Sequence, residues 1–348
     1  MPRPYLGPTL ALSAVLSCAV FASGVFAAGP YAKVAEIQIG GAGGFDYLTP
    51  DPANHRLYVS HGTELVVIDT DKNAVAGKIT GLTGMHGVAV APELGKGFIT
   101  EGRNGNKVTV FDLKTLAVQT KIVISGTPEA NPDAILYEPT KQQVWSFNHS
   151  GKSVSIIDAK TNTIVATTAL SGTVEAGQAD ASVGKVFINI EDTDSVDVVD
   201  MKTYKVIGNY KVTPAEAPTG MGMDAANHHA FIGGDKAIVM MDTNTGKVIT
   251  SAAICDGTDA TWYDAAQKMA FSSCRDGHIN AYAVSGNTIK LAQTIDTAVS
   301  ARTMALDPVT HKLYTAAVKY APVAAGAAAN ARPTAIPDSF HVLVFAQK

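Results

Sequence analysis

The sequence has little cysteine, little tryptophan and little charge. Its 348 residues include 3 cysteines and 2 tryptophans, and 17% of the residues are charged. Lysine and arginine number 27 against 31 aspartates and glutamates, so no overall basic field attracts nucleic acid or an anionic membrane. There is no CxxCH motif and no cysteine cluster, which argues against attached haem and against thiolate-rich metal centres.

Nucleotide-binding and nucleophile motifs are also missing. No P-loop, GxGxxG or GxSxG element has the right context, and the glycine-rich residues 40–44 precede a predicted strand instead of a helix. Beyond the first thirty residues no segment is typical of a transmembrane helix. These absences leave a 46% hydrophobic chain with ample material for a large core.

The N-terminal segment has the composition of a secretory signal. Arg3 is its only charge, an apolar stretch covers residues 10–26, and small residues follow. We expect a signal peptide at 1–27 with cleavage after Ala27, or alternatively after Ala28. An uncleaved membrane anchor is the competing interpretation, and the serines within the stretch disfavour it.

The rest of the chain repeats one pattern. An apolar strand, a turn, a second strand, a polar loop and a third strand ending in Asp recur at 43, 46, 42 and 42 residues, at Asp69, Asp112, Asp158, Asp200 and Asp242. Two further copies without the Asp lie at 281–284 and 342–345. A period near 40–45 residues with four short strands per unit predicts the blades of a β-propeller.

The predicted fold is all-β, a seven-bladed propeller of four-stranded antiparallel blades forming one domain over 28–348. The blades are expected at approximately 44–80, 84–124, 131–169, 173–212, 217–253, 257–295 and 300–346. The last blade lacks an outer strand, and we expect the strand at 33–39 to supply it and close the ring, which removes an exposed sheet edge.

Three segments carry a resemblance to a known family. Residues 54–59 (NHRLYV), 307–314 (DPVTHKLY) and 154–158 (VSIID) resemble the YVTN-type seven-bladed β-propeller family, the YncE-like exported proteins of bacteria. The resemblance covers everything after the signal segment. It implies the propeller fold and export, and little about activity.

The two cysteines outside the signal segment are expected to form a disulfide. In an exported protein a pair of cysteines is usually bridged. Cys255 precedes the predicted inner strand of blade six and Cys274 ends the next strand, and antiparallel pairing brings these points together. Two buried thiols are the alternative.

The predicted ligand site is a ring of polar residues at the entrance of the inner strands. Inner strands line the central channel, and six of the seven residues that open them are ionisable. The ring consists of Asp46, His86, Asp133, Glu175, Thr219, Asp259 and Arg302. The loops that leave the second strands should add Asn148, Asn189 and Glu191 to the same mouth.

Such a ring has several interpretations. The charges could pair with one another as purely structural groups, or a one-residue error in register could turn them away from the channel. They could also bind a polar ligand or a divalent cation, Ca²⁺ or Mg²⁺, through Asp46, Asp133, Glu175 and Asp259. His86 and Arg302 are then the catalytic candidates, as acid or base and as a group binding a substrate carboxylate.

Two functions follow as hypotheses. The first is an exported binding or scaffold protein that holds a small molecule, glycan or protein at the channel mouth. The alternative is a metal-dependent hydrolase, lactonase or lyase that uses the acidic ring. A redox-metal carrier is disfavoured because soft ligands are absent. We expect a periplasmic or secreted monomer that binds no nucleic acid and, once the signal is removed, no membrane.

Other conspicuous residues have structural explanations. The repeated Asp should accept backbone N–H groups in its own turn, and the histidines at 55, 228, 229 and 311 fall in first-hairpin turns at the opposite mouth. Trp145 is expected in the core. Aromatic residues near the mouth (Phe45, Tyr47, Trp262, Tyr320) would favour binding if they formed an exposed platform. The Ala-rich insertion at 319–338 is either a lid or a tolerated loop.

Overall fold

The computed structural model describes residues 1, 30–41, 44–126, 129–322 and 334–348. The predicted signal peptide and its cleavage site lie outside the described residues, as does the middle of the Ala-rich insertion. Across the described ranges, no helix combines the length and the apolar character that crossing a membrane requires.

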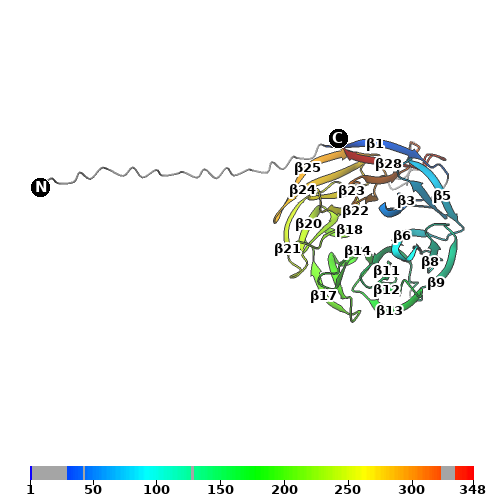
Figure 1. Ribbon diagram of the computed structural model, residues 1–348, viewed down its shortest axis with the longest axis horizontal. Coiled ribbons are helices and arrows are strands. Elements are labelled where there is room, and N and C mark those ends of the chain that lie inside the picture. Colours follow the sequence, from blue (N-terminus) through cyan, green and yellow to red (C-terminus); the bar gives the residue numbers. More distant parts are fainter. Residues whose placement is uncertain (2–29, 42–43, 127–128, 323–333) are drawn as a thin grey trace.

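Seven antiparallel sheets of four strands form a ring, which confirms the predicted propeller (Figure 1). Blades one to three are β2 (Leu48–Asp51), β3 (Arg56–His61), β4 (Glu64–Asp69) and β5 (Ala74–Thr80); β6 (Met85–Ala91), β7 (Lys96–Glu101), β8 (Lys107–Asp112) and β9 (Val118–Val123); and β10 (Pro132–Glu138), β11 (Gln143–Asn148), β12 (Ser153–Asp158) and β13 (Thr163–Ala169).

Blades four to six are β14 (Val174–Asp180), β15 (Lys185–Ile190), β16 (Ser195–Asp200) and β17 (Val206–Lys211); β18 (Glu216–Asp224), β19 (His229–Asp235), β20 (Ala237–Asp242) and β21 (Val248–Ala253); and β22 (Thr258–Asp264), β23 (Met269–Cys274), β24 (His278–Ser285) and β25 (Thr288–Asp296). Three short 3-10 turns accompany them: Pro52–Asn54, Pro92–Leu94 and Glu191–Thr193.

The seventh blade joins the two ends of the described domain. It consists of β26 (Met304–Leu306), β27 (Leu313–Ala317), β28 (His341–Gln347) and, outermost, β1 (Tyr31–Gln38). Figure 1 shows β1 beside β28, next to the C-terminus. Closure by the N-terminal strand is therefore confirmed, and β28 has a paired neighbour on both sides.

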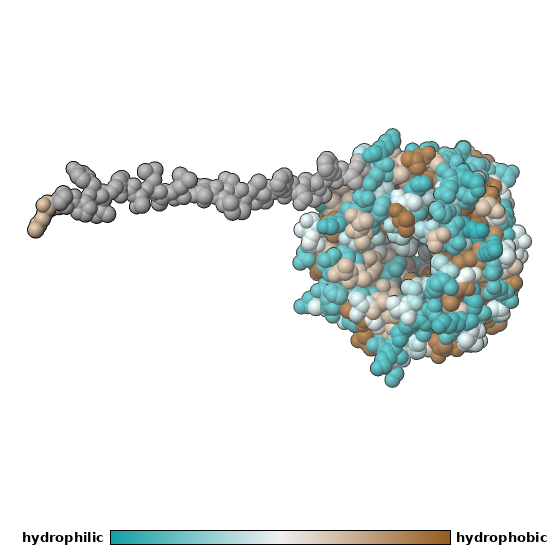
Figure 2. Space-filling view, in the orientation of Figure 1, coloured by the Kyte–Doolittle hydropathy of each residue, from teal (hydrophilic) through white to brown (hydrophobic). Residues whose placement is uncertain are grey.

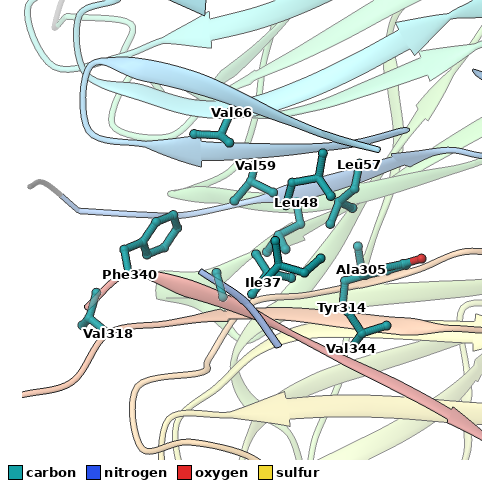
Figure 3. Packing of buried hydrophobic residues seen from close by; sticks show 13 residues of the cluster. Ile37, Leu48, Leu57, Val59, Val66, Ala305, Tyr314, Val318, Phe340 and Val344 are labelled. Carbon is teal, nitrogen blue, oxygen red and sulfur yellow. The ribbon is translucent and has the colours of Figure 1, made fainter. Parts of the chain in front are cut away.

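Apolar side chains fill the seam between the last blade and the first (Figure 3). Leu48 and Leu57 of blade one pack in one cluster with Tyr314, Phe340 and Ile37. The hydrophobic effect therefore stabilises the closed ring, since opening it would expose these buried groups to water. Trp145 is also fully buried, as predicted.

The repeated Asp residues terminate the third strands as turn caps. In five blades one carboxylate oxygen accepts the backbone N–H groups two and three residues ahead, at 2.7–3.1 Å. Asp158, for example, accepts from Lys160 and Thr161. The structural role predicted for this repeat is confirmed.

The inner strand of blade one is displaced from its predicted position. Blade one was expected to begin at about residue 44, but its inner strand, β2, begins at Leu48. The reason is local, because the Asp46 N–H donates to the Ser60 hydroxyl at 2.7 Å instead of joining a strand ladder. The short β26 likewise begins two residues after Arg302.

Candidate functional site at the channel mouth

Irregular strand pairing places the ring residues at one mouth of the channel. In five blades the register between inner and second strand shifts at the ring position: between Met85 and Val88, Pro132 and Ile135, Val174 and Gly177, Glu216 and Gly220, and Thr258 and Ala260. His86, Asp133, Glu175, Thr219 and Asp259 lie within these shifts. A bulge bends its strand and redirects side chains, which explains how a strand start can direct a charge into the channel.

Buried polar side chains of the second strands hold the backbone at these positions. The Thr100 hydroxyl accepts from the N–H of Gly87, next to His86, at 2.8 Å and also donates to the Asp133 carbonyl. The Ser273 hydroxyl donates to the Arg302 carbonyl at 2.5 Å. These hydroxyls replace ladder hydrogen bonds that the irregular pairing leaves unmade.

Five ring residues form one continuous chain of charged contacts. Arg302 pairs with Asp259 (Nη1 to Oδ2, 2.6 Å) and reaches Asp46 at 3.5 Å. Asp46 in turn lies 2.7 Å from Nδ1 of His86, and Oδ1 of Asp133 lies 3.4 Å from the same nitrogen. One imidazole nitrogen therefore faces two carboxylates and can donate only one hydrogen.

A second charged group lies beside this chain on blades three and four. Nε2 of His149 lies 3.2 Å from Glu175 and 3.8 Å from Glu191. Thr219 instead donates to the backbone carbonyl of Thr258 at 3.0 Å, so blade five contributes no charge at its ring position. His149 follows Asn148 in the loop that leaves β11 and is not one of the seven predicted ring residues.

The electrostatics of the mouth are those of crowded, poorly hydrated carboxylates. Burial, reinforced by Asp46, raises the pKa of Asp133 to about 7. Burial also raises the pKa of Asp259 to about 6, although Arg302 opposes the shift, and raises the pKa of Glu175 against the opposing effect of His149. Burial and the nearby carboxylates both penalise the charged form of an acid.

The pKa values of the two histidines are raised as well, which for an imidazole favours the charged form. A hydrogen bond to Glu175, assisted by Glu191, raises the pKa of His149 to about 10. Burial alone would lower the pKa of His86, but its hydrogen bond to Asp46 and the charge of Asp133 raise it. The positive charge of these imidazoles therefore partly offsets the repulsion among the neighbouring carboxylates.

Tyr47 forms a floor beneath the ring. It comes from blade one, yet it packs against the hydrophobic cluster of blades three and four that contains Ala134 and Phe147. Burial raises the pKa of its phenol well above the usual range, and ring carboxylates from four blades add to that effect. The Tyr47 side chain therefore crosses the channel. The sequence placed Tyr47 among the aromatic residues near the mouth but did not predict this crossing.

Two predicted ligand residues do not face the mouth. Asn148 and Asn189 are fully buried. The Asn148 amide donates to Ser153 and Ser155 of its own blade, and the Asn189 amide donates to the Gly220 carbonyl at 3.1 Å. Their position at the ends of second strands was read correctly, but the amides hold backbone and blade together instead of reaching a ligand.

The four carboxylates predicted to share a cation are divided among three sets of partners. Within the described residues, Asp46 and Asp133 group with His86, the ligand atoms lying within 4.8 Å of one another. Glu175 groups with His149 and Glu191, and Asp259 pairs with Arg302. A single ion held by all four acids is therefore not the arrangement that the structure presents.

A disulfide flanks the ring at blade six. Cys255 and Cys274 are bonded, with their Cα atoms 5.8 Å apart. The bond links Cys255, in the loop that enters β22, to Cys274 at the end of β23. Cys255 lies three residues before Thr258 and four before Asp259. The disulfide therefore constrains the backbone just before one of the ring carboxylates. Comparison with known proteins adds no family assignment, since no family model matches the chain and no curated protein is significantly similar to it.

Proposed function

We propose that this protein is an exported propeller that binds a small polar ligand at its channel mouth. The ring carboxylates would contact a cationic group of that ligand. The contact chain with Asp133 supports this most directly. Its carboxylate and that of Asp46 share one imidazole nitrogen, while the nearest guanidinium is already paired with Asp259 and Asp46.

The balance of charge favours a cation over an anion. The half-buried ring holds four carboxylates, from blades one, three, four and six, against Arg302 and the imidazoles of His86 and the neighbouring His149, so the acids outnumber the cationic groups. Arg103 and Arg275 lie on the exposed rim, outside this layer. An ammonium or guanidinium group of a ligand would supply a hydrogen-bond donor to Asp133 and a further donor to Glu175, beside His149, and would favour their charged forms.

A binding screen tests the proposal. The mature chain is titrated calorimetrically with small organic amines, with matched carboxylic acids and with neutral sugars. We expect saturable binding of one or more amines, weakened at least tenfold in Asp133→Asn. The matched control is Asp296→Asn, whose carboxylate is 96% exposed and lies 3.7 Å from His278, which is not a ring residue. Binding confined to the acids or sugars would contradict the proposal.

A metal-dependent hydrolase, lactonase or lyase is the second candidate. The observation in its favour is the close set of Asp46, His86 and Asp133, whose donor atoms suit a divalent cation such as Ca²⁺ or Mg²⁺. Its test is the metal content of protein purified without chelator, compared with Asp133→Ala and Glu175→Ala. A stoichiometric ion that is lost only in Asp133→Ala would favour this candidate, and metal-free wild-type protein would remove it.

Membership of the YVTN-type, YncE-like family and a periplasmic or secreted location belong to the same proposal. They are supported by the repeat motifs, by the seven blades and by the disulfide, a bond that persists in oxidising compartments. A signal-processing assay, comparing the mass of the protein recovered from the cell envelope with that of the full chain, tests export and cleavage together.

A further inference from the structure

The channel contains a second compartment, which the residues of the charged ring do not line. A cavity of about 250 Å³ lies along the inner strands of blades one to four and reaches Trp262 of blade six. Figure 2 looks along the short axis of the molecule and shows the ring hollowed near its centre. The cavity begins one residue beyond the ring, at Tyr47, Gly87, Ala134 and Ala176, and none of the ring residues lines it.

Small side chains on neighbouring blades leave this space open. Gly87, Ala134 and Ala176 directly follow three ring residues, and Ala89 and Gly177 lie farther along the same wall. Part of the wall could not be larger, since a Cβ at Gly177 would come 2.7 Å from the Phe147 ring. Bulky side chains complete the lining, among them Tyr47, Phe147 and Trp262.

The lining is mostly apolar, with few free polar groups. The indole N–H of Trp262 already donates to the Met304 carbonyl at 2.8 Å, and Thr49 donates to the Val88 carbonyl at 2.7 Å. The Tyr137 hydroxyl is bonded to Glu93. Gln178 contributes an amide to this lining. Water held in such a space has few partners, whereas an apolar molecule with one polar substituent matches it.

We propose that this compartment, the apolar chamber, binds a one- or two-ring aromatic molecule carrying a single hydrogen-bonding group such as a phenol hydroxyl. Its volume exceeds the roughly 150 Å³ of an apolar cavity that holds benzene. The rings lie against Trp262 and Tyr47, and the hydroxyl bonds to the Gln178 amide. Tyr47 separates this ligand from any ligand at the charged ring.

Titration of the folded protein with 2-naphthol tests the chamber. Calorimetry should show saturable binding with one site, and the bound naphthol should quench part of the tryptophan fluorescence, because Trp262 lines the chamber while Trp145 is buried in blade three. Ala176→Leu should weaken binding at least tenfold by filling the space. Ala181→Leu, an exposed alanine in the turn that follows the same strand, is the matched control and should bind like wild type.

Three further variants keep the test decisive. Gln178→Leu should weaken binding about threefold to tenfold. Trp262→Phe should retain calorimetric binding, because phenylalanine keeps an aromatic face in the chamber, but it should lose the quenching. This variant tests the chamber even if Ala176→Leu fails to fold. Asp133→Asn should leave naphthol affinity within twofold, which separates this site from the charged ring. Absence of saturable binding in wild type, or equal binding in a folded Ala176→Leu, would show a channel that holds only water and would overturn the proposal.

Discussion

Two sets of carboxylates in this propeller have the same chemistry and opposite environments. The turn carboxylates (Asp69, Asp112, Asp158, Asp200) lie at the blade turns, and the ring carboxylates (Asp46, Asp133, Glu175, Asp259) lie at the channel mouth. Hydrogen bonds from the turn lower the pKa of Asp112, Asp158 and Asp200, and a hydrogen bond from Lys72 lowers that of Asp69. Burial raises the pKa of the ring carboxylates Asp133, Glu175 and Asp259.

The difference teaches how structural acids can be distinguished from candidate binding acids. Each turn carboxylate accepts two backbone N–H groups from its own turn, so its charge is satisfied by local sequence. The ring carboxylates come from different blades and compete for Arg302, His86 and His149. A ligand could therefore supply missing hydrogen-bond donors to the ring carboxylates, whereas the turn carboxylates already accept donors from their own turns.

The largest expected effect comes from removing a buried carboxylate in another kind of turn, the one between the inner and second strands of blade six. Asp264, at the end of β22, accepts from the N–H groups of Ala266 and Gln267 and lies 2.7 Å from His311. Asp264→Ala should lower the free energy of unfolding by about 2–4 kcal/mol, because it removes a buried carboxylate that accepts two backbone N–H groups and pairs with His311. Urea denaturation measures it. Asp264→Asn, which keeps an acceptor, should cost clearly less, and equal losses would contradict the explanation.

A ring carboxylate should behave in the opposite way. The folded-state pKa of Asp133, about 7, exceeds the ordinary value of 3.8, so its stability penalty is absent below pH 4, grows as the pH rises and is complete above 7. Asp133→Asn should therefore raise the free energy of unfolding by about 1–3 kcal/mol at pH 8 and change it little near pH 4.

The comparison for that prediction is made across pH. Urea denaturation of wild type and Asp133→Asn at pH 4, 6 and 8 should give curves that diverge as the pH rises, whereas Asp296→Asn should follow wild type throughout. A destabilised Asp133→Asn at pH 8 would mean that the contact with His86 outweighs desolvation and repulsion.

The smallest effect is expected at a surface turn. Asp158→Ala removes the acceptor for Lys160 and Thr161 and should lower the free energy of unfolding by about 1 kcal/mol, because these N–H groups can turn to water. Asp158→Asn should cost about half as much. Thermal unfolding at matched pH resolves the pair, and an effect as large as that of Asp264→Ala would erase the distinction between exposed and buried turns.

The fold could be predicted because its signal is repeated and local. Asp at the end of the third strand, with Lys or Thr following, records the turn chemistry of five blades, and seven copies of the strand pattern fix the architecture. The ring positions followed from the same alignment, although the inner strand of blade one begins later than predicted since Asp46 bonds to Ser60.

The contacts of the site could not be predicted in the same way. Whether Asn189 faces a ligand or the Gly220 carbonyl depends on the bulge beside it, which no pattern of period two reveals. The division of the acids between Arg302, His86 and His149 depends on side chains that converge from different blades. The crossing of Tyr47 over the channel depends on small residues in blades three and four, far away in sequence.

The most direct measurement is the titration of aspartate side-chain carboxyl groups by carbon-13 NMR, followed at Asp133 and at Asp158. The crowded ring predicts that Asp133 titrates near pH 7 while Asp158 titrates below the value of a free aspartate. If Asp133 instead titrated near 4, like an ordinary hydrated carboxyl group, the ring would hold no unsatisfied acid and the basis for a cationic ligand at the channel mouth would be lost.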